Sequence, residues 1–314
     1  MYFCSIKTIK TYIKMKKSIL LPLCGVVLAS CSTVALTGRK QLNLVSESEV
    51  LSASLSEYQS YMKTAKVSTD AAATTRVKGI AQRIAAAAEA YLQATGQEAD
   101  LQNYAWECNL VQDNQLNAFC MPGGKIVVYT GMVALAGSGA DADDELAAVI
   151  GHEVGHAIAK HGQERASQQV LTSLGSQVLG GLTAGKSEAV QQAVGLAYGM
   201  GTQYGALLPF SRKHELEADY IGIVLATIAG YDANAAVTLW QKMQAASTTS
   251  TPEFASTHPS SDTRISELQK KIPEVQKAFG AAGQASKAAA TKSSSSSSTK
   301  KSSSSKSGTG FKIG

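Results

Sequence analysis

Hydrophobic residues recur at steps of three and four along much of the chain, which is the spacing of helices that bury one face. The clearest run is followed by Gly96, where a helix would stop, and consists of Val77, Ile80, Ile84, Ala88 and Tyr91. An earlier helix is predicted from Ser46 toward Met62, because Ser46 and Glu49 have the spacing of a capping box. These helices are expected to cover the core from one side.

The period changes in the middle of the chain, where two short segments at 104–111 and 125–130 are rich in β-branched and aromatic residues. Turn-forming pairs at Asp113-Asn114 and Gly123-Gly124 separate the extended segments, so the pattern predicts a small antiparallel meander. The chain as a whole is therefore predicted to be an α+β fold, mainly α-helical, with a small antiparallel β-sheet.

Two cysteines flank the predicted turn. Cys108 and Cys120 lie symmetrically about Asn114, so a hairpin centred there would place them nearly opposite one another. A disulfide between them is a candidate in an oxidising compartment. Two buried free thiols explain the same residues, because cross-strand geometry is often unsuitable for a disulfide.

A further helix is predicted from Asp141 to about Ala166, with acidic residues crowded at its N-terminal end, where they favour the helix dipole. The stretch 173–208 is rich in Gly and Ala, and its apolar residues indicate either loosely packed helices or a mobile flap. The next helix is predicted to start near Ser211 and to run to Gly230.

The N-terminus has the pattern of a targeting segment. Lysines precede an apolar run at 19–29 that is too short to span a bilayer as a helix, so residues 1–30 are predicted to be a signal peptide. Leu28-Ala29-Ser30-Cys31 resembles the lipobox of bacterial lipoproteins, in which Cys31 would become the lipidated first residue. An ordinary secretory signal with an incidental cysteine is the alternative. Ser32, in place of Asp, favours the outer over the inner membrane under enterobacterial sorting rules.

The positive charge is confined to the two ends. Residues 1–30 carry five lysines and no acids, residues 282–314 carry six lysines and no acids, and the net charge of the chain is +5. The middle is therefore acidic, and no nucleic-acid-binding surface is expected. Residues 282–314 are Ser, Lys, Ala and Gly with almost nothing to bury, so they are predicted to be disordered, which leaves one folded domain at 31–281.

The strongest chemical signal is His152-Glu153-Val154-Gly155-His156, inside the most apolar predicted helix. Positions i and i+4 differ by roughly 40° around a helix, so both imidazoles project from one face, as two ligands of a tetrahedral zinc require. Glu153 lies off this line, within reach of a metal-bound water, as a general base would. A surface helix with two unrelated histidines is the alternative, and the apolar flanks disfavour it.

A third ligand is needed, and its type separates the classes of zinc peptidase. One class has a further histidine six residues after the motif, but that position is Gly162, and His161 comes one residue too early, so it is read as a supporting or structural residue. Glu215 and Asp219 share one helical face, with Glu217 turned roughly 160–200° away. We expect Glu215 as the ligand and Asp219 as acceptor of a ligand's ring N–H. A solvated acidic face is the alternative.

Residues from about 37 to about 268 resemble the gluzincin family that includes the CaaX prenyl endopeptidase, HtpX and Oma, and most closely its periplasmic lipoprotein branch, the LoiP and BepA type. The motifs that match in order are Thr37-Gly-Arg-Lys-Gln-Leu42, Asn117-Ala-Phe-Cys-Met-Pro-Gly-Gly124, His152 to His156, Ser211-Arg-Lys-His-Glu215 with Ala218-Asp219, and His258-Pro259 with Arg264. In that family the first Glu of the Glu-x-x-x-Asp pattern is the metal ligand, which supports Glu215. The chain leaves no room for the helical repeat domain of BepA-type members, so a single-domain enzyme is expected.

The resemblance also implies roles that spacing alone would not indicate. His258 would stabilise the oxyanion or cap the metal as a removable fourth ligand, and Arg264 would assist it. Asn117 and Ala118, with the strand 125–130, resemble the family's substrate-binding edge, which pairs with an extended peptide through its backbone.

These parts predict a zinc-dependent metalloendopeptidase that holds one Zn²⁺ per chain on His152, His156 and Glu215, with Glu153 taking and returning the proton of the attacking water. The expected substrates are misfolded or damaged cell-envelope proteins, met at the periplasmic face of the outer membrane through the lipid on Cys31. Two alternatives stay open. One is a mainly non-proteolytic periplasmic chaperone or assembly factor with a latent, His-capped zinc site, and the other is a peptidase for one narrow substrate with 173–208 as a selective lid.

Overall fold

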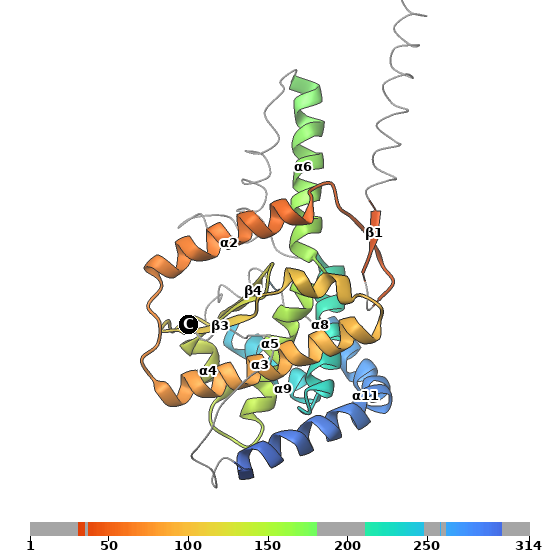
Figure 1. The fold of residues 1–314 in the computed structure, drawn as a ribbon. Helices are drawn as coiled ribbons and strands as arrows, with labels where there is room; N and C mark the ends of the chain where they lie inside the picture. The colour runs from red at the N-terminus through yellow and green to blue at the C-terminus, as the bar shows by residue number, and fades with distance from the viewer. Residues whose placement is uncertain (1–30, 35–36, 181–210, 248–257, 259–261, 297–314) are drawn as a thin grey trace, which may run out of the picture.

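The computed structural model describes residues 31–34, 37–180, 211–247, 258 and 262–296 (Figure 1). The strands are β1 (Cys31–Thr33), β2 (Lys40–Leu42), β3 (Glu107–Val111), β4 (Ala118–Met121) and β5 (Lys125–Tyr129). The helices are α2 (Glu47–Thr64), α3 (Ala71–Ala94), the 3-10 helix η1 (Glu98–Asn103), α4 (Thr130–Ala136), α5 (Ala142–Ile158), α6 (His161–Gly180), α8 (Arg212–Ile228), α9 (Ala235–Ser247) and α11 (Asp262–Ser296). The prediction of a mainly helical α+β fold is confirmed.

Helix α5 occupies the middle of the structure and packs against α8, α3, α9 and strand β4 (Figure 1). Almost every residue of α5 is buried, which explains why its sequence is apolar on all sides rather than along one stripe. Its polar residues His152, Glu153 and His156 are buried with the rest. Because buried polar groups need partners, these three side chains require a polar site around them.

The small sheet is mixed, with the strand order β3-β5-β4. Strand β5 runs parallel to β3 and antiparallel to β4. The predicted antiparallel meander is therefore wrong in its pairing, because the hairpin turns at Gly123 and Gly124, which have positive φ angles of 87° and 81°, and not at Asn114. All five residues of β5 are buried, as a central strand with neighbours on both edges should be.

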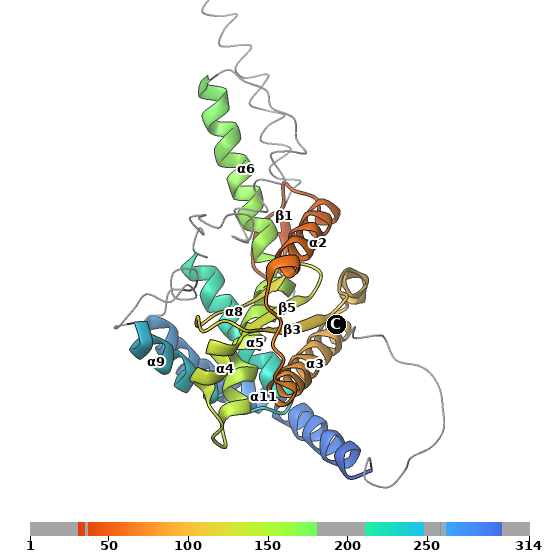
Figure 2. The same cartoon turned by 90° about the vertical axis from the view of Figure 1, so that its left-hand side faces the viewer.

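The two faces of β5 contact different helices, because successive side chains of a strand point to opposite sides. Ile126 and Val128 face the main core with α3 and α5, whereas Val127 and Tyr129 cluster with Tyr58 of α2. The sheet is thus covered on both sides, with α2 on one face and α3 and α5 on the other (Figures 1 and 2).

The sheet order decides the state of the cysteines. Cys108 of β3 and Cys120 of β4 are both paired with Ile126 of β5, so a whole strand lies between them. Two strand spacings of about 4.8 Å exceed the Cα separation that a disulfide allows. Both are buried free thiols, and the candidate disulfide is wrong. Burial raises the pKa of Cys108 to about 12 and that of Cys120 well above its usual value, so neither is a reactive thiolate.

The helices predicted in the first half are confirmed. Ser46 forms the capping box with Glu49 at the start of α2, and Gly96 follows α3 with a positive φ of 72°. The helix predicted over 141–166 is in fact two helices, α5 and α6, because the chain breaks at Lys160, whose φ is 55°. Ion pairs from Lys160 to Glu47 at 2.8 Å and to Asp100 at 3.2 Å hold this unusual backbone in place.

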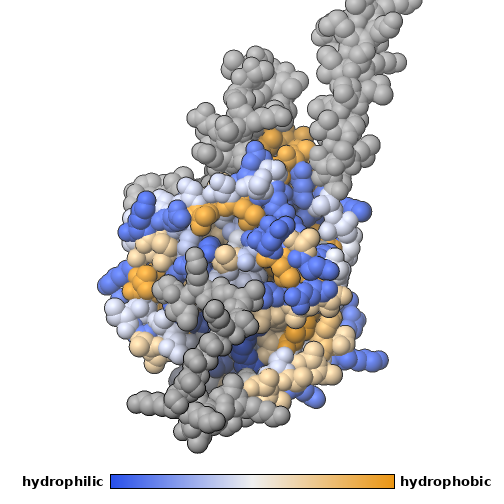
Figure 3. Space-filling view, in the orientation of Figure 1, coloured by the Kyte–Doolittle hydropathy of each residue, from blue (hydrophilic) through white to orange (hydrophobic). Residues whose placement is uncertain are grey.

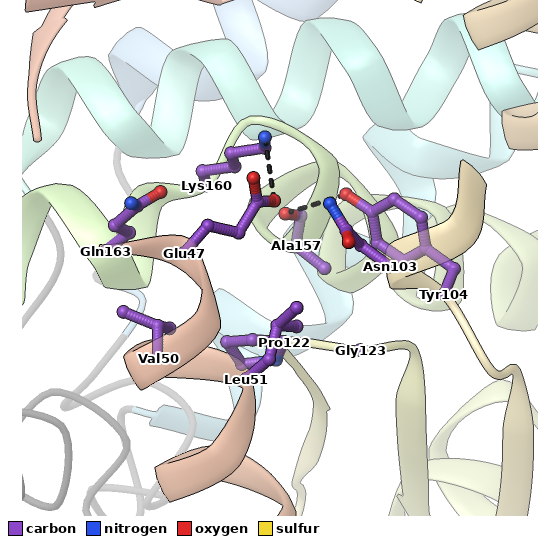
Figure 4. A pocket seen from close by; sticks show the side chains of 10 residues that line it. All are labelled: Glu47, Val50, Leu51, Asn103, Tyr104, Pro122, Gly123, Ala157, Lys160 and Gln163. Atoms are coloured by element: carbon purple, nitrogen blue, oxygen red, sulfur yellow. Dashed lines mark hydrogen bonds and ion pairs between the residues drawn. The ribbon is translucent and has the colours of Figure 1, made fainter. Parts of the chain in front are cut away.

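A small pocket lies at this break, between α2, η1 and the start of α6 (Figure 4). Figure 4 shows the ion pair that joins Lys160 to Glu47 among the residues that line the pocket, which include Tyr104 and Pro122. Its cavity volume of about 20 Å³ leaves room for a water molecule. The pocket is therefore part of the packing around Lys160.

The C-terminal boundary differs from the prediction. Helix α11 continues to Ser296, beyond the boundary predicted at residue 281, so residues 282–296 are helical rather than disordered. Residues 297–314 lie outside the described part of the chain, as do the predicted signal peptide and residues 181–208 of the predicted flap. The part of the flap that is described, 173–180, is the end of α6, which projects beyond the body of the domain (Figure 2).

The face drawn in Figure 3 carries hydrophilic areas interspersed with hydrophobic ones. The exposed large hydrophobic residues of the described part are Leu55, Val67 and Leu171. Among the described helices, none is both long and apolar enough to cross a membrane.

Candidate metal centre

The site depends on a close contact between α5 and α8, which glycines allow. A Cβ on Gly222 would lie 2.8 Å from the backbone nitrogen of His152, and a Cβ on Gly151 would lie 2.9 Å from the carbonyl oxygen of Gly222. Neither contact would be tolerated, so the two helices can approach this closely only without side chains there. The contact places the histidines of α5 directly opposite Glu215 and Asp219 of α8.

The first turn of α8 is fixed by its cap. Ser211 precedes the helix, and its hydroxyl accepts a hydrogen bond of 3.2 Å from the backbone N–H of His214. Glu215 stands in this first turn, where a negative charge is favourable. Local sequence therefore sets the position from which Glu215 reaches α5.

Four buried side chains converge at this contact, namely His152, His156, Glu215 and His258, and their candidate ligand atoms all lie within 4.8 Å of one another. The Nε2 atoms of His152 and His156 are 3.1 Å apart. They lie 3.6 Å and 3.4 Å from the carboxylate oxygens of Glu215. Nδ1 of His258 lies 3.4 Å from Nε2 of His152 and 3.1 Å from Oε1 of Glu215.

These spacings fit a tetrahedral zinc ion. When zinc lies 2.0–2.1 Å from each ligand, two corners of the tetrahedron are about 3.3 Å apart. The distances above scatter around this value, and imidazole and carboxylate are ligands that zinc prefers. The structure thus brings together the three predicted ligands and adds His258 at the fourth corner.

The ring of His152 is held from behind by a carboxylate. Its Nδ1 lies 3.0 Å from Oδ1 of Asp219, as the helical spacing predicted. Arg264 grips Asp219 with two bonds, from Nε at 2.7 Å and from an Nη at 2.6 Å, and its other Nη lies 2.8 Å from Glu215. Trp240 packs against Arg264 and His152. Its ring lies 4.1 Å from the guanidinium of Arg264 and edge-on to the ring of His152.

The ring of His156 is held by another imidazole. Nδ1 of His161 lies 2.8 Å from Nδ1 of His156, and Nε2 of His161 lies 2.9 Å from a carboxylate oxygen of Glu217. The break at Lys160 makes this possible, because it lets His161 open a new helix beside His156 rather than continue α5. His161 is thus a support of the site, in agreement with one of its two predicted readings.

The surroundings of the cluster favour the zinc-binding forms of His156 and Glu215. Burial drives the pKa of His156 well below its usual value, so its imidazole is neutral. Burial alone would raise the pKa of Glu215, but the charge of His258 and hydrogen bonds from His156 and His258 hold it well below its usual value. Arg264 likewise outweighs burial and lowers the pKa of Asp219.

Glu153 differs from the other carboxylates of the site. Its Oε1 is buried and has no hydrogen-bond partner among the described residues, and it lies 3.8 Å from Nε2 of His258. Burial, together with the negative charge of Glu215, raises the pKa of Glu153 above its usual value despite the opposing effect of His258 and His152. A carboxylate of raised pKa is able to accept and return a proton near neutral pH.

His258 and Arg264, which the resemblance implied, both lie in the site. His258 stands in the ligand cluster itself, the position expected of a fourth ligand. Arg264 is buried, and its contacts are with Asp219, Glu215 and the carbonyl oxygen of His258 at 3.5 Å. It acts on the metal cluster through these partners.

The predicted substrate-binding edge needs one correction. The strand at 125–130 corresponds to β5, which lies between two neighbours and has no free edge. Among the described strands, β4 is the outer strand that contacts α5, and it begins at Ala118 directly after Asn117. Asn117 and Ala118 therefore lie at the start of this strand, and their role in substrate binding stays a prediction.

Several residues of the site carried no sequence signal that spacing could reveal. Trp240 was not singled out, and Glu217 was placed on the side of α8 that faces away from Glu215. Gly222 has a meaning only once α5 and α8 are in contact. Cys31, the predicted lipidation site, starts β1 opposite Leu42, and its lipidation stays a prediction.

Comparison with known proteins agrees with this geometry. The model of peptidase family M48 matches residues 74–272, which include all four members of the cluster. The mitochondrial metalloendopeptidase OMA1 of Schizosaccharomyces pombe is 39% identical over 173 residues, covering 54% of this chain and 48% of that protein. The human mitochondrial metalloendopeptidase OMA1 is 28% identical over 248 residues, covering 77% of this chain and 46% of that protein.

A bacterial protein is also similar to the chain. The beta-barrel assembly-enhancing protease of Yersinia pestis is 28% identical over 181 residues, covering 56% of this chain and 36% of that protein. The chain thus spans about a third to a half of the length of these three relatives.

Proposed function

Since the chain belongs to peptidase family M48, we propose that it is a zinc-dependent endopeptidase that hydrolyses peptide bonds of misfolded or damaged cell-envelope proteins. The observation that carries the proposal is the cluster of His152, His156, Glu215 and His258. Beside it lies a carboxylate oxygen of Glu153 that has no hydrogen-bond partner among the described residues. The cluster supplies a place for one zinc ion, and Glu153 supplies the base that peptide hydrolysis requires.

The chemistry divides between the metal and the protein. Bound zinc supplies Lewis acidity, which lowers the pKa of a water molecule and polarises the scissile carbonyl. Glu153 takes a proton from the attacking water as the new C–O bond forms, and returns it to the amide nitrogen as the C–N bond breaks. Its raised pKa suits both transfers.

His258 provides a way to keep this site inactive. With its Nδ1 at the fourth corner of the cluster, it occupies the position that an attacking water would need. Activity then requires His258 to move aside, and the two predicted roles, metal cap and oxyanion donor, become two positions of one side chain. This arrangement is also the observation that favours the rival function, a chaperone with a latent zinc site.

The substrate is proposed to be an extended segment. The free edge of β4 lies next to α5 and offers backbone groups to an added strand, which selects unfolded segments rather than a particular sequence. Such selection suits quality control. Supporting the envelope location, one relative is named a beta-barrel assembly-enhancing protease, and Cys31 follows a lipobox-like sequence that would anchor the enzyme in the outer membrane.

The test compares the purified protein with its Glu153→Gln variant on an unfolded outer-membrane β-barrel protein, with zinc content measured for both. We expect equal zinc content and a loss of cleavage of at least about 10³-fold in the variant. Equal cleavage by both proteins would overturn the mechanism. If neither cleaves although zinc is bound, and both prevent aggregation of the substrate, the chaperone function replaces the proposal.

A further inference from the structure

The β1–β2 hairpin lies far from the metal cluster in sequence and reaches it in space. Between its strands, Thr37 and Arg39 extend toward the start of α6 and the first half of α8. Neither residue belongs to the matched family segment, which begins at residue 74. Their contacts are with buried carboxylates, so the hairpin does more than cover the surface.

Arg39 joins two carboxylates that come from different helices. Its Nε lies 2.6 Å from Oε2 of Glu217 on α8, and its two Nη atoms lie 3.1 Å and 2.7 Å from the two oxygens of Glu164 on α6. The side chains of Glu217 and Glu164 are only 5% and 8% exposed. Thr37 also donates a hydrogen bond from its hydroxyl to Oε1 of Glu217.

Glu217 is therefore fixed on three sides, by Thr37, Arg39 and His161. His161 connects Glu217 to the proposed zinc ligand His156, since Nδ1 of His161 lies 2.8 Å from Nδ1 of His156. If His156 binds zinc through Nε2, its proton sits on Nδ1 and is donated to His161, which must then carry its own proton on Nε2 and donate it to Glu217. The position of the Glu217 carboxylate thus decides the tautomer and the ring orientation that His161 offers to His156.

We propose that Thr37 and Arg39 are positioning residues of the zinc site, which hold Glu217 so that His161 orients the ligand His156. The inference rests on the proposed zinc binding by His156. It also links two parts of the molecule, because the hairpin that completes the site starts at Cys31, the predicted point of lipid attachment. The segment next to the membrane anchor is then a part of the metal centre.

The experiment measures zinc affinity of the full-length protein by competition with a chelator at pH 7.5. Arg39→Gln should raise the zinc dissociation constant about 10-fold, because supporting residues of metal ligands typically contribute 10–100-fold. Arg39→Lys should recover part of the lost affinity, since an ammonium keeps the positive charge but cannot make the planar, two-sided contacts of a guanidinium. Lys40→Gln is the matched control, because it removes the same charge from the next residue, whose ammonium donates a hydrogen bond to Thr33. Its zinc dissociation constant should stay within about twofold of that of the unaltered protein.

Two further measurements separate positioning from folding. The visible spectrum of the Co²⁺-substituted protein should change in Arg39→Gln and not in Lys40→Gln, because it reports ligand geometry. Thr37→Val removes a single bond to Glu217 and should raise the dissociation constant about threefold even if Arg39→Gln does not fold. If Arg39→Gln and Thr37→Val lower the melting temperature of the zinc-free protein but leave affinity and spectrum unchanged, the contacts are structural and the inference is wrong. Failure of the unaltered protein to bind zinc would overturn the proposed function instead.

Discussion

The two histidines of the motif stand one turn apart on α5, yet they are held by different parts of the molecule. His152 is supported by Asp219 and Arg264, whose side chains are each 4% exposed. His156 is supported through a longer chain that ends at Arg39, whose side chain is 25% exposed. We call these sets the inner support, Asp219 with Arg264, and the outer support, His161 with Glu217 and Arg39.

Both supports end in an arginine that neutralises a buried carboxylate, but they differ in what their loss would cost. A charge left alone in the core is far more destabilising than one at the rim, where water can solvate it. The inner support therefore belongs to the stability of the fold as well as to the metal site. Changing Arg39 should cost less stability, because the buried carboxylates that it leaves behind keep other partners: Glu164 keeps His214 and Glu217 keeps His161. The outer support is therefore the part through which zinc affinity should be adjustable.

Breaking the inner support should have the largest effect. Asp219→Asn leaves the buried Arg264 without its main partner, so the free energy of unfolding should fall by about 3 kcal/mol and zinc affinity by about 100-fold. Urea unfolding of the zinc-free protein and chelator competition measure the two effects. Asp143→Asn, which removes an ion pair to Arg76 from a side chain that is 57% exposed, should cost less than about 1 kcal/mol. Equal losses in the two variants would remove the distinction between core and rim.

Separating α5 from α8 should affect both supports together. Gly222→Ala places a Cβ 2.8 Å from the backbone nitrogen of His152, and we expect a loss of about 1–3 kcal/mol with weaker zinc binding. Gly79→Ala is the matched control, since a Cβ there meets nothing within 4 Å on helix α3. It should stabilise the protein by about 0.5–1 kcal/mol. Thermal unfolding of both variants measures these effects. An unchanged melting temperature in Gly222→Ala would contradict the close contact between α5 and α8.

Trp240 offers a milder test confined to the inner support. Trp240→Phe weakens the contact with the guanidinium of Arg264, for an expected loss of about 1–2 kcal/mol in unfolding free energy. Because Arg39 pairs with Glu164 and Glu217 whereas Trp240 packs on His152 and Arg264, the effects of Trp240→Phe and Arg39→Gln on stability should add within about 0.5 kcal/mol. A double-mutant cycle that shows strong coupling would mean that the two supports are not separate.

Lowering the pH should weaken the outer support, and the resulting loss of stability should be the smallest of these effects. Burial would raise the pKa values of Glu164 and Glu217, but hydrogen bonds from Arg39 and from His214 or His161 hold both at about 2. Their unfolded values are near 4.5, so the stabilisation they give is present above that pH and is lost as the pH falls toward 2. Between pH 5 and 3, the free energy of unfolding of the zinc-free protein should fall by about 1 kcal/mol more than that of zinc-free Arg39→Gln. If the melting temperatures of the two proteins fell in parallel over this pH range, the prediction would be wrong.

The sequence predicted what depends on residues close together in the chain. The spacing of His152 and His156, that of Glu215 and Asp219, and the capping box at Ser46 each act within about one helical turn, and the structure has them as expected. The local pattern also placed Glu217 away from Glu215 correctly. It could not show that this other side of α8 faces His161 rather than solvent.

What the sequence could not predict depends on contacts between distant segments. The order of β3, β5 and β4 is decided by which strand needs two neighbours, and the strands' own residues do not encode the partner. The break at Lys160 has no glycine to mark it, because ion pairs from α2 and η1 hold the backbone there. Arg39 belongs to a motif of the resemblance, but its role appears only when the hairpin meets α8.

X-ray absorption at the zinc edge of the purified protein would show directly whether this cluster binds zinc. We predict one zinc per chain, bound by nitrogen and oxygen atoms at about 2.0–2.1 Å, with the scattering of imidazole rings from His152, His156 and His258. Glu215→Gln should abolish this signal, and Glu217→Gln should retain it. Sulfur scattering at about 2.3 Å, which would point to Cys108 or Cys120, or a signal that survives in Glu215→Gln, would contradict the account.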